Sequence, residues 1–256
     1  HTDKQRILWN NFYEYQFVHA ADTDFFIVAT AAQQAMLVKQ LKKYQHVDAK
    51  VVVIPVGSLT SLKQRPYQQR RRHTLITASR LASEKHIDWL ISAVIAARRT
   101  VGDLVLDIYG YGEQHDRLQR QIDAAQATGY IHLMGQHRLD DVYQNYAGYI
   151  AASTSEGFGL SLLEAVGGGL PMIGFDVPYG NQTFIDPERN GLLLPYDEQQ
   201  DETEKVAALT AAVKRLFADE SQGAKFSQHS YEIAEHYLDD QILAKWQRLV
   251  KEEIDA

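Results

Sequence analysis

The chain of 256 residues contains no cysteine. This absence excludes a disulfide framework, a thiolate metal site and a cysteine nucleophile. A long hydrophobic run is also absent, since apolar stretches such as residues 89–97 are far shorter than the roughly 18 residues that span a bilayer. We therefore expect a cytoplasmic protein without a signal peptide, either free or peripheral at the inner face of the cell membrane.

Positive charge is not in excess. Lys and Arg number 26 against 33 Asp and Glu, which gives a formal net charge of -7. This balance argues against a protein that binds nucleic acid independently of base sequence, and we expect no nucleic-acid partner. Hydrophobic residues make up 45% of the chain, an ordinary share for a globular core. Any anion that the protein binds must therefore be held by a local site.

Short apolar runs alternate with amphipathic stretches, which predicts βαβ units and an α/β fold with a Rossmann-like parallel sheet. Most of the runs are continuously apolar, as strands buried on both faces are. Helical spacing of apolar residues predicts helices over residues 87–95 and 139–146, and two or three more after the last strand. The predicted strands are residues 25–29, 51–54, 74–77, 104–109, 131–133, 149–152 and 171–173.

A boundary is expected where the strand signals stop and Ser, Gln, Pro and Arg become frequent. We interpret residues 58–72 as a linker between residues 1–57, the remnant of a larger domain, and a second domain over residues 73–256. The linker ends in three consecutive arginines, residues 70–72. A phosphate-binding patch is the alternative for these arginines, but no aromatic residues interleave with them, and a solvated linker is the favoured interpretation.

The most informative segment is residues 155–164, Ser-Glu-Gly-Phe-Gly-Leu-Ser-Leu-Leu-Glu. It follows a predicted strand and opens a helix, so its backbone N–H groups form an anion site at the positive end of that helix. Glu156 lies in the loop, and Glu164 lies about one turn into the helix, where a carboxylate could reach hydroxyls such as those of a ribose. The alternative is that the glycines only permit a tight turn and that Glu164 is solvated.

A second segment favours the functional interpretation. Residues 79–86, Ser-Arg-Leu-Ala-Ser-Glu-Lys-His, also lie between a predicted strand and a predicted helix. Arg80 and Lys85 therefore flank a crevice at the carboxyl ends of the strands, where doubly wound sheets bind ligands. Two cations there suit a diphosphate. Surface ion pairs with Glu84 or Asp88 are the alternative for this segment alone, but both segments on one sheet favour the diphosphate.

Together, the Arg80-(x4)-Lys85 pair and the Glu156-(x7)-Glu164 pair resemble those of the group 1 (GT4) retaining glycosyltransferases. That family has the GT-B fold, in which two Rossmann-like domains face a cleft. Residues 9–17, 54–58 and 175–185 look similar to the protein O-GlcNAc transferases that modify serine-rich adhesins in the accessory Sec pathway of Gram-positive bacteria. Poly(glycerol-phosphate) glucosyltransferases of teichoic acid synthesis are similar as well.

The resemblance implies a role for each matching residue. Arg80 and Lys85 are expected to neutralise the nucleotide diphosphate and to stabilise the leaving group, and Glu156 to lie beside the donor sugar; these three form the catalytic set. Glu164 is expected to bind the ribose, whereas His137 as a catalytic base is the less favoured interpretation. Further donor contacts are expected from Gly110, Gly112, Gly135, Gln136, His137, Gly157, Phe158, Gly159 and Leu160.

As a donor, the resemblance implies UDP-GlcNAc or UDP-glucose, and as an acceptor a serine-rich protein or a glycopolymer. The acceptor-binding domain of the family precedes the matched part, so this chain alone is expected to be inactive. A glycosyltransferase-like partner subunit is also implied. We expect no cofactor and no metal, because the Asp22-x-Asp24 pair precedes its predicted strand and lies at the wrong edge of the sheet.

Three alternatives to a protein O-GlcNAc transferase stay open. One is a teichoic-acid glucosyltransferase, and another is a phosphorolytic enzyme of the same architecture, which would need a pyridoxal phosphate lysine that we cannot place. The third is a non-catalytic binding or chaperone module with a glycosyltransferase-like fold. Such a module has no need for Arg80, Lys85, Glu156 and Glu164 together, so their joint presence favours an enzyme.

Overall fold

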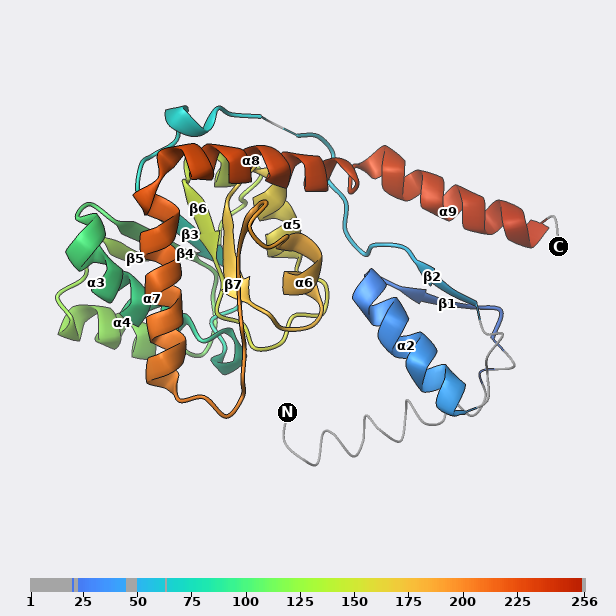
Figure 1. Cartoon of the computed structure of the whole chain (residues 1–256), viewed down its shortest axis with the longest axis horizontal. Coiled ribbons are helices and arrows are strands. Elements are labelled where there is room, and N and C mark those ends of the chain that lie inside the picture. The colour runs from blue at the N-terminus through green and yellow to red at the C-terminus, as the bar shows by residue number, and fades with distance from the viewer. Residues whose placement is uncertain (1–19, 21–22, 45–49, 63, 255–256) are drawn as a thin grey trace. The chain divides into compact units, whose positions relative to one another are not determined.

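The computed structural model describes residues 20, 23–44, 50–62 and 64–254 (Figure 1). The chain divides into two compact units, residues 1–56 with 245–256, and residues 57–244, and each is described by itself. The aromatic segment at residues 9–17 lies outside the described residues, as does Asp22. Within the described part, no helix is both long enough and apolar enough to cross a membrane.

In the smaller unit, two parallel strands, β1 (Phe25–Val28) and β2 (Lys50–Val53), flank the helix α2 (Ala31–Lys43). The helix begins with a capping box, since the Thr30 hydroxyl accepts a hydrogen bond from the Gln33 amide and the Gln33 side chain accepts one from the Thr30 amide. Both strands lie where the apolar runs predict them.

The larger unit is built on a six-stranded sheet in which all neighbouring strands are parallel, so the prediction of an α/β fold with a parallel sheet is confirmed. From β3 the chain winds outward through β4 to β5, then returns to β6 beside β3 and winds the other way. The topological switch point therefore lies between β3 and β6. The order across the sheet is β5 (Ile131–Gly135), β4 (Val105–Tyr109), β3 (Thr74–Ala78), β6 (Gly148–Ile150), β7 (Met172–Phe175) and β8 (Gly191–Leu194).

Helices cover both faces of this sheet (Figure 1). One face carries α3 (Ile87–Val101), α4 (His115–Ala124) and α7 (Glu202–Ala218). The other carries α5 (Leu160–Gly167), α6 (Gly180–Phe184) and α8 (Glu220–Glu235). A last helix, α9 (Asp239–Ile254), begins in the larger unit, and its residues from Lys245 onward group with the smaller one.

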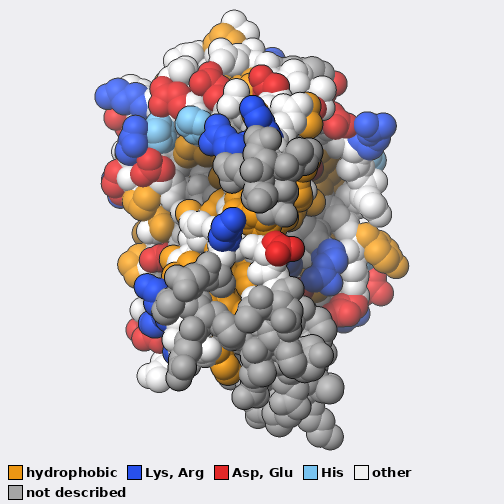
Figure 2. Space-filling model, turned by 90° about the vertical axis from the view of Figure 1, so that its right-hand side faces the viewer, with side chains coloured by type: hydrophobic (Ala, Val, Ile, Leu, Met, Phe, Trp, Pro, Cys, Tyr) orange, Lys and Arg blue, Asp and Glu red, His pale blue; other side chains and the backbone are white. Residues whose placement is uncertain are grey.

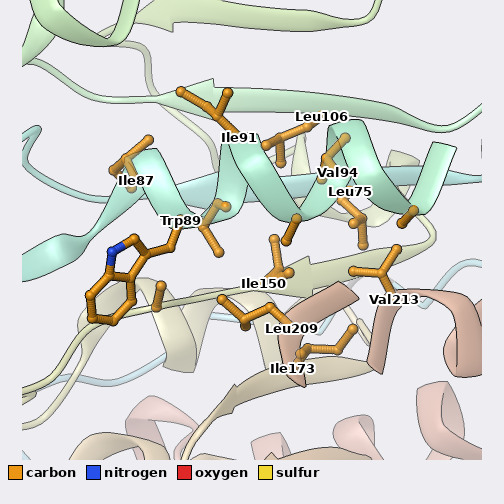
Figure 3. Close-up of a cluster of buried hydrophobic side chains, with 14 of the residues drawn as sticks. Leu75, Ile87, Trp89, Ile91, Val94, Leu106, Ile150, Ile173, Leu209 and Val213 are labelled. Atoms are coloured by element: carbon orange, nitrogen blue, oxygen red, sulfur yellow. The ribbon is translucent and has the colours of Figure 1, made fainter. Parts of the chain in front are cut away.

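The main core lies between the sheet and the α3 and α7 helices (Figure 3). Because helices cover both faces, most residues of these strands are apolar and do not alternate with polar ones, as the sequence predicts; Asp107 in β4 and His132 in β5 are exceptions. Figure 3 labels the side chains that meet there: Leu75, Leu106, Ile150 and Ile173 from the strands, Ile87, Trp89, Ile91 and Val94 from α3, and Leu209 and Val213 from α7.

One sequence-based prediction of secondary structure is wrong, and one strand was missed. Residues 139–146 contain only the 3₁₀ turn η4 (Tyr143–Asn145), because Tyr143 and Tyr146 are buried as single aromatic anchors of a loop. The strand β8 was not predicted, since its four residues begin with a glycine, which lowers strand propensity.

Figure 2 shows that acidic and basic side chains are intermingled over the described residues of the face it presents, with neither sign predominating.

The expected linker, residues 58–72, belongs to the larger unit and runs along α8. Backbone hydrogen bonds join Leu59 to the start of α9, and the Arg65 amide donates to the Tyr231 hydroxyl at 3.0 Å. The interpretation of the three arginines as solvated is wrong for Arg70, which is only 5% exposed and donates to the Ser227 hydroxyl at 3.2 Å. This segment, expected to be a linker, is thus part of the larger unit.

Candidate functional site

Lys85 and Glu156 meet at the switch point of the sheet. Lys85 ends the 3₁₀ turn η3 (Ser83–Lys85) after β3, and Glu156 lies in the loop after β6. The Lys85 Nζ and Glu156 Oε2 atoms are 2.6 Å apart, and the two side chains are 13% and 18% exposed. Tyr149 and Ser161 line the same narrow crevice, with their hydroxyls 3.1 Å apart. The structure therefore brings one residue of each sequence motif into contact.

The loop that carries Glu156 is fixed to the loop after β7. The Glu156 amide donates to the Pro178 carbonyl at 3.2 Å, and the Glu156 carbonyl accepts from the Tyr179 and Gly180 amides at 2.5 and 2.9 Å. These backbone hydrogen bonds leave the Glu156 side chain directed at Lys85. The segment 175–185, which carried part of the family resemblance, thus supports the loop after β6.

The α5 N-terminus follows directly. Gly159 caps the helix with a φ of 84°, a left-handed conformation that glycine adopts without steric cost, and its carbonyl accepts from the Leu162 and Leu163 amides. The Phe158 ring is buried against Phe184, with ring centroids 5.2 Å apart, whereas Gly157 and Leu160 are exposed. The turn therefore places its aromatic side chain in the core and its backbone at the surface.

Glu164 lines an open pocket of about 630 Å³, together with residues 58–61 and the segment 137–144. Its Oε2 atom accepts a hydrogen bond from the buried Tyr143 hydroxyl at 2.9 Å. Partial removal from water raises the pKa of the Glu164 carboxyl above its usual value, the nearby Asp140 adds to this increase, and the Tyr143 hydrogen bond opposes it. The volume and the mixed polar and apolar lining suit a nucleoside.

Of the expected contacts in the loop after β5, His137 lines this pocket, and Gly135 and Gln136 precede it. The Gly135 carbonyl accepts from the Gly110 amide at 2.8 Å, which ties this loop to the loop after β4. The His137 ring meets the Tyr109 ring edge to face, with centroids 6.0 Å apart. These contacts hold the mouth of the pocket.

Gly110 and Gly112 support the site by packing. A Cβ atom on Gly110 would lie 1.8 Å from the Ser79 carbonyl oxygen, and one on Gly112 would lie 2.4 Å from that of Leu81. The Leu81 amide can therefore donate to the Tyr111 carbonyl at 3.0 Å, so the loop after β4 lies directly against the loop that carries Arg80. In this structure the two glycines position that loop.

Arg80 stands apart from the other charged residues of the site. Its side chain is 76% exposed, and its guanidinium pairs with the Glu84 carboxylate at 2.7 Å. The sequence motif places Arg80 beside Lys85, but in the described part of the chain its ion pair is with Glu84, as in the surface alternative. Among the described residues, no group of three or more His, Asp or Glu side chains is placed to hold a metal ion.

Some residues of the site had no signal in the sequence. Tyr143 lies in a stretch with helical spacing, and residues 58–61 lie in the expected linker, yet both line the pocket around Glu164. Ser161 falls within the segment 155–164, but nothing in the sequence distinguishes it from its helical neighbours. Each of these contacts depends on packing between segments that are distant in sequence.

Comparisons with known proteins identify the family of the chain. The family model "Glycosyl transferases group 1" matches residues 72–219, more than half of the chain. The chain is 52% identical over 252 residues to the UDP-N-acetylglucosamine–peptide N-acetylglucosaminyltransferase GtfA subunit of Limosilactobacillus reuteri, and the match covers 98% of this chain and 49% of that protein.

Two solved structures are similar over nearly the whole chain. The pneumococcal O-GlcNAc transferase GtfA in complex with UDP and GlcNAc has a TM-score of 0.89 at 47% identity, covering 96% of this chain and 48% of that chain. A GtfA/B complex has a TM-score of 0.91 at 49% identity, covering 96% and 49%. The chain thus spans about half the length of the relatives that it matches. The chain belongs to the group 1 glycosyl transferases.

Proposed function

We propose that the chain is the donor-binding part of a retaining glycosyltransferase that transfers GlcNAc from UDP-GlcNAc to a peptide. The observation that carries this proposal is the Lys85–Glu156 contact at the switch point of the sheet, in a crevice that Ser161 near the α5 N-terminus also lines. Ligands of doubly wound sheets bind at such a switch point. The two motifs therefore meet where a nucleotide sugar is expected.

The charged groups suit a nucleoside diphosphate. The uridine would occupy the pocket lined by His137 and Glu164, with the Glu164 carboxylate accepting hydrogen bonds from the ribose hydroxyls. The diphosphate would lie between the α5 N-terminus and the Lys85 ammonium. Arg80 is exposed and would leave Glu84 to join the diphosphate.

Catalysis would then rest on electrostatics and on positioning. As the bond between the sugar and the diphosphate breaks, negative charge grows on the diphosphate, and the cations and helix N–H groups aimed at it stabilise the transition state. Glu156 would hold Lys85 in place and lie beside the sugar. No side chain of this chain is proposed as a nucleophile.

The choice of donor and acceptor rests on the relatives. The proteins that are about half identical to this chain are named as UDP-N-acetylglucosamine–peptide transferase subunits, and one solved relative holds UDP and GlcNAc. A solved complex of two subunits, GtfA and GtfB, supports a partner subunit for this protein as well. We place the protein in the cytoplasm. The donor domain, expected over residues 73–256, would also include residues 58–72, which belong to the larger unit and line the pocket of Glu164, and residues 1–57 would form part of the acceptor side.

A transfer assay tests this proposal. The full-length protein, with and without its partner subunit, is incubated with a serine-rich peptide and either UDP-GlcNAc or UDP-glucose. The mass of the peptide is then measured by mass spectrometry. The proposal predicts a gain of one N-acetylhexosamine that Lys85→Ala reduces strongly. Donor binding without any gain in peptide mass would instead indicate a non-catalytic module, and a gain of hexose alone would indicate a glucosyltransferase.

A further inference from the structure

His86 adopts a backbone conformation that is uncommon for residues other than glycine. Its φ and ψ angles are 46° and 45°, in the left-handed region, which most residues with a Cβ atom disfavour and which His, Asn and Asp occupy more often than the rest. Among the described residues, tertiary contacts hold it there. Its ring stacks on Trp89, with centroids 3.7 Å apart and planes at 16°, and its Nε2 atom lies 3.5 Å from the Thr154 hydroxyl, the upper limit of a hydrogen bond.

The left-handed turn at His86 sets where the neighbouring Lys85 lies. His86 immediately follows Lys85 and immediately precedes the first residue of α3, so the left-handed turn sets the direction in which the chain leaves the β3 loop. Three contacts then join this loop to the loop after β6. They are the Thr154 amide to the Glu84 carbonyl at 3.3 Å, the Thr154 hydroxyl to His86, and Lys85 to Glu156 at 2.6 Å.

The platform under the His86 ring is itself held firmly. Trp89 is buried, and the Lys205 ammonium lies 5.5 Å from its ring centroid and 5.3 Å from that of Tyr196. Lys205 is only 5% exposed and donates to the Glu198 and Gln200 carbonyls at 3.3 and 2.7 Å. A buried lysine that is anchored on backbone carbonyls fixes the indole, and the indole fixes the imidazole.

Protonation does not disturb this arrangement near neutral pH. Burial lowers the pKa of His86 below its usual value, and the Lys205 charge lowers it further, whereas the carboxylates of Asp88, Glu202 and Glu84 raise it. The ring is therefore neutral at pH 7 and adds no second positive charge beside Lys85. Its contribution is steric and conformational.

We propose that His86 is a positioning residue for the diphosphate arm of the site. Its left-handed conformation, held by Trp89 and Thr154, directs Lys85 across the switch point to Glu156. This inference rests on the proposed function, because it takes Lys85 as the group that receives the donor diphosphate. His86 itself touches no reacting atom.

The test replaces His86 by residues that differ in their tolerance of this conformation. Glycine adopts it freely, whereas valine opposes it, so His86→Gly and His86→Val separate the backbone turn from the imidazole. UDP and uridine are titrated by calorimetry into the full-length protein and both variants. Uridine reports the pocket of Glu164, which His86 does not line, and UDP reports the diphosphate arm as well.

We expect His86→Val to weaken UDP binding about tenfold, His86→Gly to stay within about threefold of the parent, and uridine binding to change less than about twofold in both. Should His86→Val not unfold cooperatively, His86→Ala replaces it with the same expectation. Unchanged UDP binding in His86→Val, equal losses in His86→Val and His86→Gly, or an equal loss of uridine would each overturn the inference. A parent protein that binds no UDP would overturn the proposed function and the inference together.

Discussion

The Lys85 ammonium lies 2.6 Å from the Glu156 carboxylate, although 71 positions separate the two residues in the sequence. The contact closes the switch point, because one partner follows β3 and the other follows β6. Both side chains are mostly buried, so the pair is screened less by salt than a surface ion pair. In the proposed binding mode, the donor diphosphate would therefore meet a cation that is already in place.

Lys85→Ala is expected to weaken UDP binding about 10- to 100-fold, because it removes a partly buried charge-assisted contact to the diphosphate. Uridine, which has no phosphate, should bind almost as tightly as before. Calorimetric titration of both ligands measures the difference. The matched control is Lys225→Ala, an exposed lysine on α8, which should change neither affinity. Equal losses of UDP and uridine in Lys85→Ala would contradict the assignment.

The Arg80–Glu84 ion pair is exposed and is expected to break when the diphosphate binds. Glu84→Gln should therefore tighten UDP binding, by about two- to fivefold at low salt, since it removes the competitor for Arg80. Arg80→Ala should weaken UDP binding less than Lys85→Ala does. Titrations at two salt concentrations measure both effects, and a Glu84→Gln variant that binds UDP more weakly than the parent would refute this role for Arg80.

Uridine binding is expected to fall in mild acid. In the proposed binding mode the ribose hydroxyls would donate to the Glu164 carboxylate. The raised pKa of this group means that it takes up a proton at a higher pH than an ordinary glutamate, whose pKa is 4.5. Affinity should thus be lost as the pH falls through the raised pKa, and Glu164→Gln should show no such loss. Uridine is the ligand of choice here, because it carries no titrating phosphate.

The Tyr143 hydrogen bond provides a second variant for the same titration. It lowers the pKa of Glu164, so Tyr143→Phe should raise that pKa and move the loss of uridine affinity to higher pH. A shift to lower pH in Tyr143→Phe, or an unchanged profile in Glu164→Gln, would show that another group controls the binding.

Asp107 is expected to make the free energy of unfolding depend on pH in the acid range. This buried carboxylate accepts hydrogen bonds from Tyr146 at 2.5 Å, His132 at 2.7 Å and Arg71 at 3.2 Å. Burial alone would raise its pKa, but these partners more than offset that effect and hold the pKa below the usual 3.8. Its contribution to stability is therefore present above about pH 4 and is lost as the pH falls through the lowered pKa.

Asp107→Asn should accordingly lower the free energy of unfolding at pH 7 by about 2–4 kcal/mol, because Arg71 loses its buried partner. Its stability should also change less between pH 5 and pH 3 than that of the parent protein. Urea unfolding at the two pH values measures both quantities. A variant whose stability falls as steeply in acid as the parent's would assign the acid sensitivity to other carboxylates.

Gly110→Ala is expected to destabilise the protein by about 2–4 kcal/mol, because the added methyl group meets the Ser79 carbonyl at 1.8 Å and the φ of 139° disfavours alanine. Gly129→Ala is the control, since open space surrounds the added Cβ atom there. Thermal unfolding of both variants measures the difference. An equally small destabilisation by both substitutions would show that the loop after β4 can shift to accommodate the added methyl group.

The strand pattern was predictable because most strands of the larger sheet are buried, and a short, mostly apolar run between turn residues is typical of such a strand. For β8 the prediction failed, because a run of four residues that begins with Gly191 carries too short a signal. The false helix at residues 139–146 arose because buried tyrosines of a loop imitate helical spacing. The spacing of apolar residues alone cannot distinguish the buried face of a helix from single buried side chains of a loop.

That the two motifs lie at the same edge of the sheet was predictable, because parallel strands end at one edge. That their loops are neighbours follows from the pairing of β3 with β6, which the sequence alone did not predict. Which charges pair across them was not predictable either. Lys85 meets Glu156, whereas Arg80 turns outward to Glu84, and no periodicity in the sequence distinguishes these two cations. The Tyr143–Glu164 hydrogen bond likewise depends on how η4 packs against α5. The ligand roles of all these residues stay predictions until they are measured.

The most direct test of the donor site is a calorimetric titration of the full-length protein with UDP, UDP-GlcNAc and UDP-glucose, with and without EDTA, beside the Glu164→Ala variant. We predict saturable UDP binding that EDTA does not change and that Glu164→Ala abolishes, with UDP-GlcNAc preferred over UDP-glucose. No binding of any of the three ligands at millimolar concentration, or binding that Glu164→Ala leaves intact, would contradict a nucleotide-sugar site at this edge of the sheet.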